Sequence, residues 1–173
     1  MSSQADASPR TTRGVVYVHS APTSLCPHVG WALESVLGRR VGLDWTPQPA
    51  GPRLVRAELS WVADAGTGAR LASALRGSDH LRYEVAEEPS PGVDGSRWSY
   101  TPSLGIHHTW VSVIGDALVH EDQIRATLAR AGGDAGTLET ELDALLGGPW
   151  DRELEPFRYA GDGAPVRWLH KVG

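Results

Sequence analysis

The chain has 173 residues, 40% of them hydrophobic and 21% charged, which is typical of one folded domain with an apolar core. Its net charge is −5, and its fifteen arginines are scattered rather than gathered in a basic stripe. This composition argues against binding to nucleic acid or to a membrane surface. The single cysteine, Cys26, excludes an intrachain disulfide and fits a reducing compartment, so we expect a cytoplasmic protein.

The first 88 residues alternate between β-rich runs and helical patterns. Residues 1–12 are polar and predict a disordered tail. The runs that follow predict a strand, a helix, two strands, a helix and a strand, in that order. They cover 13–20, 25–37, 41–46, 53–62, 66–77 and 81–86. This order is that of a ferredoxin-like βαββαβ unit over 13–88, with two helices on one face of an antiparallel sheet.

The second half of the chain gives weaker patterns. Residues 89–105 are rich in Pro, Gly and Ser and predict a long loop. Residues 106–173 predict an α+β extension that packs on the same domain. Its expected elements are a β-hairpin around Gly115 and Asp116, helices over 121–131 and 137–146, an amphipathic stretch over 149–161 and a strand over 166–172. The fold class is therefore α+β.

Cys26 and His28 stand at the start of the first predicted helix, shortly after His19. A helix N-terminus stabilises a thiolate, and a nearby imidazole would activate it further, so these three residues are candidates for a Cys/His catalytic site. The alternative is that Cys26 is a small buried apolar residue and His28 a surface residue. A metal site is not expected, because there is one Cys and because the adjacent His107 and His108 point to opposite faces of a strand.

A glycine-rich turn opens the second predicted helix. Gly66, Thr67 and Gly68 would leave backbone N–H groups free to hold a phosphate or an acyl-phosphate, with Arg70 nearby. The turn is neither a P-loop nor a dinucleotide-binding motif, because the residues that would complete either are missing. The alternative is a plain helix entry. No cofactor is expected.

Seven tryptophans are spread along the chain, and Trp98 lies with Tyr100 inside the predicted long loop. Aromatic side chains exposed on a loop often anchor a protein interface or a ligand site. The two residues are therefore candidate interface residues. The alternative is that the loop folds back and buries them.

Several blocks resemble one family. RGVVYVHSAPTSLCPHVGWAL, LDWTPQP, AELSW, GTGARLASALRGSDHLRYEVAEEPSPG and YTPSLG are similar to the actinobacterial proteins of unknown function grouped as the DUF3145 family. The resemblance covers most of the chain after residue 13. It implies no catalytic residue, because the family has no established activity. It does imply a partner in fatty-acid synthesis, among acyl carrier protein, ketosynthase or acyl-CoA carboxylase components.

The sequence thus favours a non-catalytic interaction or regulatory protein over an enzyme. The alternative is a small enzyme or ligand-binding domain that uses Cys26, His28 and His19 or the helix start at 66–70. A protein partner is expected, and neither nucleic acid nor a membrane. A homodimer is plausible, because sheets of this kind often pair through a face or an edge.

Overall fold

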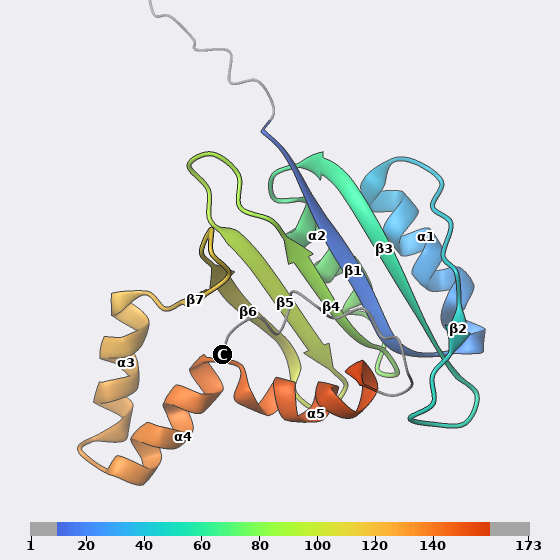
Figure 1. Cartoon of the computed structure of the whole chain (residues 1–173). Helices are drawn as coiled ribbons and strands as arrows, with labels where there is room; N and C mark the ends of the chain where they lie inside the picture. Colours follow the sequence, from blue (N-terminus) through green and yellow to red (C-terminus); the bar gives the residue numbers. More distant parts are fainter. Residues whose placement is uncertain (1–9, 160–173) are drawn as a thin grey trace, which may run out of the picture.

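The computed structural model describes residues 10–159, and these form an α+β fold built on one antiparallel sheet of seven strands in the order β2-β3-β1-β4-β5-β6-β7 (Figure 1). The strands are β1 Thr11–Pro22, β2 Thr46–Pro47, β3 Leu54–Asp64, β4 Arg82–Glu87, β5 Gly95–Thr101, β6 Gly105–Val111 and β7 Ala117–Leu118. Within this range the α-helices are α1 Cys26–Leu37, α2 Thr67–Leu75, α3 Glu121–Ala131, α4 Ala135–Leu145 and α5 Gly148–Arg158.

The main core lies between one face of the sheet and the pair α1 and α2. Val16 and Val18 of β1 and Trp61 of β3 point into it, and α1 and α2 add Leu33 and Leu71. Along each strand, side chains that point into this core alternate with side chains on the opposite face of the sheet. This is the period-two pattern that predicted these strands. Helix α1 ends at Gly38, whose φ of 65° is left-handed, as the sequence predicts for a glycine at a helix end.

The opposite face of the sheet is partly covered by α5, which crosses in front of the sheet in Figure 1. Leu154 and Arg158 of α5 are fully buried there. This helix, Gly148–Arg158, overlaps most of the amphipathic stretch predicted over 149–161. It gives the sheet helices on both faces, whereas the sequence predicts them on one face.

Residues 41–46 were expected to form a complete strand, but only Thr46 and Pro47 pair with β3. Val41, Leu43 and Trp45 nevertheless pack against the main core as partly buried side chains. Their spacing of two reflects burial of alternate side chains. It does not reflect backbone pairing, so the prediction of a strand over 41–46 is wrong.

The prediction of a continuous loop over 89–105 is also wrong, because β5 occupies Gly95–Thr101 and pairs with β4 and β6. Ser96, Trp98 and Tyr100 alternate along β5 on the face that carries α1 and α2, so the strand pattern is present in the sequence. The surrounding Pro, Gly and Ser residues are typical of turns and loops, so they favoured the prediction of a loop over that of a strand.

The rest of the described chain follows the predicted order. β6 and β7 form the hairpin around residues 112–116, and α3 and α4 match the helices expected over 121–131 and 137–146. Thr11 and Thr12 belong to β1 and not to the expected tail. Residues 1–9 and the strand expected over 166–172 lie outside the described residues. Over 10–159, no helix is long and apolar enough to cross a membrane.

Candidate functional site

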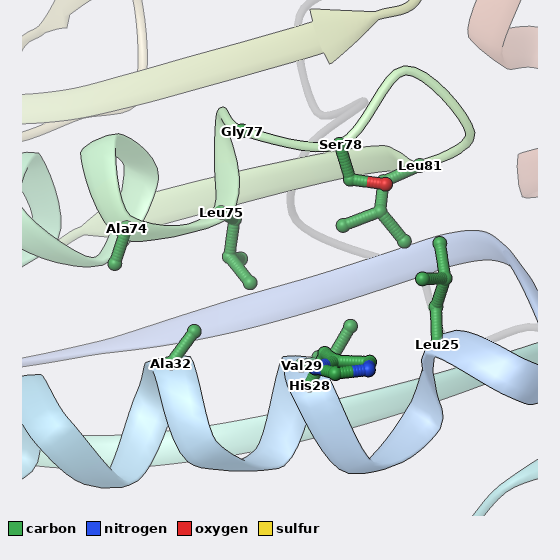
Figure 2. A pocket seen from close by; sticks show the side chains of 9 residues that line it. All are labelled: Leu25, His28, Val29, Ala32, Ala74, Leu75, Gly77, Ser78 and Leu81. Carbon is green, nitrogen blue, oxygen red and sulfur yellow. The ribbon is translucent and has the colours of Figure 1, made fainter.

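An apolar groove with a volume of about 410 Å³ runs between α1 and α2. Figure 2 shows its two walls, with Ala32 opposite Leu75 and with Leu25 opposite Leu81. Leu25 comes from the short 3-10 turn Thr23–Leu25 that precedes α1, and Leu81 immediately precedes β4. The lining is mostly aliphatic, with His28 and Ser78 as its only polar side chains.

Trp31 stands on α1 one turn after His28 and is 60% exposed. The His28 ring meets it edge to face, with ring centroids 5.2 Å apart. His28 also lines the groove, so the indole lies close to the groove's α1 wall. The spacing of three residues along a helix is what brings the two rings together. A large exposed indole next to an apolar groove is an arrangement typical of a binding surface.

The structure does not bring Cys26, His28 and His19 together. Cys26 and His28 belong to α1, whereas His19 points to the other face of the sheet, where its ring stacks on Tyr17 and its Nε2 lies 2.7 Å from Oε2 of Glu84. The Cys26 thiol has only a long contact of 4.0 Å with the carbonyl oxygen of Pro22. Burial raises the pKa of this thiol above its ordinary value, which is opposite to what a nucleophilic cysteine needs.

The glycine-rich start of α2 already holds an anion from its own chain. The backbone N–H groups of Gly66 and Gly68 donate to the two carboxylate oxygens of Glu87, at 2.7 and 2.6 Å. Arg70 donates to the Thr67 hydroxyl at 2.8 Å. The carboxylate occupies the position that a phosphate would take, because a helix N-terminus attracts either group. Glu87 ends β4, and its role was not visible in the sequence.

Trp98 and Tyr100 are strand residues of the core region and not loop residues. Tyr100 is buried, its ring stacks on Tyr83 at 4.9 Å, and its hydroxyl donates to the carbonyl oxygen of Ser78 at 3.3 Å. Trp98 is partly buried and stacks on His108. Both residues therefore stabilise the sheet, which leaves Trp31 as the more accessible aromatic candidate.

A buried polar cluster between the sheet and α5 was missed by the sequence reasoning. Its centre is Glu84 of β4, which is fully buried. Its carboxylate accepts hydrogen bonds from Arg158 of α5, at 2.8 Å from the guanidinium Nε, and from the Ser99 hydroxyl at 3.1 Å, and it pairs with His19. Burial opposes its ionisation, but His19 and Arg158 outweigh that cost and hold the pKa of Glu84 well below its usual range.

Glu84 and Arg158 are both buried and are paired with each other, so the cluster holds α5 against the sheet. Gln48 extends it, because its side-chain N–H groups donate to the carbonyl oxygens of His19 and Phe157 at 2.6 and 3.0 Å. The sequence could not reveal it, since alternation along β4 assigns Glu84 to a solvent face unless the position of α5 is known.

Within residues 10–159, no group of three or more His, Cys, Asp and Glu side chains is arranged to hold a metal ion. His107 stacks on Trp150 of α5, whereas His108 stacks on Trp98 on the other face. The expectation that these neighbouring histidines point apart is therefore confirmed.

Over residues 10–159, the fold and the groove define a small α+β protein with a candidate binding surface. Comparison with known families gives a match to the model described as "Protein of unknown function (DUF3145)", over residues 15–171. The chain belongs to this family, as its sequence blocks indicate. No curated protein and no solved structure matches the chain.

Proposed function

We propose that this protein is a non-catalytic interaction module, and that it binds a protein partner through Trp31 and the groove between α1 and α2. The observation that carries the proposal is the exposed Trp31 indole beside an apolar groove that His28 connects to it. Tryptophan is enriched among the residues that dominate binding energy at protein interfaces. Burying its exposed surface together with the groove would remove a continuous apolar area from water.

The chemistry of the groove favours an apolar side chain of a protein as its occupant. Sites for small polar substrates bring several polar groups together, whereas only His28 and Ser78 supply polar side chains here. A partner's leucine or phenylalanine could fill the space between Val29 and Leu75, while its backbone passes over Trp31. The absence of a paired nucleophile and base at Cys26 is consistent with a non-catalytic role.

The test places a photo-crosslinking phenylalanine analogue at position 31 in the native host and identifies what it captures. The purified captured protein is then titrated against the wild-type chain and Trp31→Ala. We expect Trp31→Ala to weaken binding by about tenfold or more. Val62→Ala is the matched control, because Val62 is 64% exposed but belongs to β3 and not to the groove. Equal affinities of Trp31→Ala and the wild type contradict the proposal.

A fatty-acyl chain is the second candidate, because six aliphatic side chains line a groove of a volume that suits small ligands. The six are Leu25, Val29, Ala32, Ala74, Leu75 and Leu81. A rise in melting temperature with an acyl-CoA or a free fatty acid, lost when Ala32→Asp places a charge in the groove, would favour this ligand over a protein partner.

Three further proposals accompany this one. Residues 13–88 form a ferredoxin-like unit, which is supported by the strand order β2-β3-β1-β4, by antiparallel pairing and by the packing of α1 against α2. The protein is actinobacterial and acts in the cytoplasm. Its partner belongs to fatty-acid synthesis, which rests on the family resemblance alone and is tested by the identity of the captured protein.

A further inference from the structure

The helical hairpin made of α3 and α4, residues 121–146, is named here the acidic arm. Figure 1 shows the two helices side by side and away from the sheet. In α3 only Thr127 and Ala131 are buried, and in α4 no residue is buried. The arm is therefore held together mainly by contact between its own two helices, and most of its surface faces solvent.

The arm carries most of the net charge of the chain. It contains six acidic and two basic residues, which gives −4 of the −5 that the whole chain carries. Both arginines are already paired within the arm, Arg125 with Glu121 and Arg130 with Glu141. Over residues 10–159, Asp122 and Glu139 have no ion pair. The remaining surface charge of the arm is therefore negative.

An open apolar stripe lies among these charges. Ile124 and Leu128 are one helical turn apart on α3, and they are 40% and 52% exposed. They flank Thr127 and Ala131, which are the residues of α3 that are buried. Side chains four residues apart lie on the same face of a helix. The α3 stripe therefore extends past the contact with α4 and leaves two aliphatic side chains without cover.

We infer that the acidic arm is a second docking surface, for a protein segment in which basic residues flank apolar ones, such as a basic amphipathic helix. The apolar side chains of such a segment would cover Ile124 and Leu128, and its Lys or Arg residues would be attracted by the net negative charge of the arm. A second copy of this chain is a poor occupant, because a symmetric contact would bring −4 against −4. An anionic membrane or a nucleic acid would be repelled for the same reason.

The test uses the full chain and two fluorescein-labelled helical peptides of about 18 residues, each with leucines along one face. One carries lysine on its other face and the other carries glutamate. Fluorescence anisotropy should detect binding of the lysine peptide only. Ile124→Ser with Leu128→Ser should weaken this binding about tenfold, and Asp122→Asn with Glu139→Gln should weaken it and reduce its dependence on salt.

Matched substitutions outside the arm distinguish binding at this surface from nonspecific attraction to exposed charges or exposed apolar side chains elsewhere on the protein. Val113→Ser removes an exposed aliphatic side chain from the turn between β6 and β7, and Glu155→Gln removes an exposed charge from α5. Trp31→Ala tests the groove. None of the three should change the affinity. Circular dichroism verifies that each variant is folded, and the two arm variants are independent of each other.

Two results would overturn the inference. Equal binding of the glutamate peptide would mean that charge does not select the occupant. Binding unchanged in both arm variants, or weakened as much by the controls, would place the peptide elsewhere.

Discussion

Glu84 carries a negative charge at a position that solvent does not reach, and three side chains form polar contacts with its carboxylate. Each partner comes from a different element: His19 from β1, Ser99 from β5 and Arg158 from α5. A buried ion pair contributes little net stability compared with an apolar replacement of both partners, but removing one partner alone is costly. The cluster therefore makes the position of α5 specific.

Arg158→Met should destabilise the fold by about 3–5 kcal/mol, because it leaves the Glu84 carboxylate buried without its main counter-charge. The double variant Glu84→Gln with Arg158→Met should lose less than the sum of the two single variants, since it removes both charges together. Urea unfolding gives the free energies for this cycle. A strictly additive double variant would show that the two side chains do not interact.

The stability contributed by Glu84 should depend on pH. Its pKa is lower in the folded chain than in the unfolded chain, so the unfolded state binds the extra proton first as the pH falls. The contribution is complete above the ordinary value of about 4.3 and declines as the pH drops below it. The difference in unfolding free energy between wild type and Glu84→Gln should thus shrink from neutral pH to about pH 3. A constant difference would contradict this assignment.

At the scale of single elements, the start of α2 depends on close contact with β4 and β5. Glu87 of β4 caps the helix, and Trp98 of β5 lies directly against Gly68. A β-carbon at position 68 would lie 2.7 Å from Cζ3 of Trp98 and 2.8 Å from Oε2 of Glu87. Glycine is therefore required here by space, because the backbone approaches two fixed side chains.

Gly68→Ala should destabilise the protein by about 1–3 kcal/mol, because either the indole or the capping carboxylate must move. Gly30→Ala is the matched control in α1, where an added β-carbon meets nothing within 4 Å. It should stabilise the protein by roughly 0.5–1 kcal/mol, since alanine restricts the unfolded chain. Thermal unfolding of both variants measures this. Equal effects of the two substitutions would show that contact at position 68 does not matter.

The elements that the sequence predicts well are those whose pattern depends only on neighbours along the chain. The spacing of Leu25, Val29 and Leu33 places α1, and the alternation of Ala57, Leu59 and Trp61 places β3. β5 was missed because Pro, Gly and Ser residues surround its alternation, and the alternation over 41–46 reflects burial without backbone pairing.

The candidate site follows the same division. Trp31 and His28 share one helix, and the sequence already marked His28 as a candidate, although as part of a catalytic group. The groove itself needs α1 and α2 to pack side by side. The contact of Glu87 with Gly66 and Gly68 needs the end of β4 to meet the start of α2. Contacts of this kind arise from tertiary packing, so the roles of Glu87 and Glu84 could only be assigned once the fold was known.

Over the whole described molecule, stability should be unevenly distributed. β1 lies between β3 and β4 and contributes Val16 and Val18 to the core, whereas the acidic arm buries almost nothing. Regions with few buried contacts open at lower free energy than the core. The molecule therefore combines a stable core, made of the sheet with α1 and α2, with a weakly held pair of helices, α3 and α4.

Hydrogen–deuterium exchange should show this difference. Backbone amides of α3 and α4 should exchange at least about a hundredfold faster than those of Val16 and Val18 in β1, because the arm can open without disrupting the core. Peptide-level mass spectrometry resolves the two regions, with α2 as an internal comparison for a well-buried helix. Equal protection of the arm and β1 would mean that the arm unfolds only with the whole domain.

The tether between Glu84 and Arg158 also sets an order of events during synthesis. The two residues are 74 positions apart, and a ribosome adding roughly 5–20 residues per second needs about 4–15 s to make the chain between them. During that interval β4 can already pair with β1 and β5, so His19 and Ser99 can reach the carboxylate, but the guanidinium of Arg158 is still missing. The sheet is sealed on that side only when the last described helix is made, so native burial of Glu84 reports that this helix is in place.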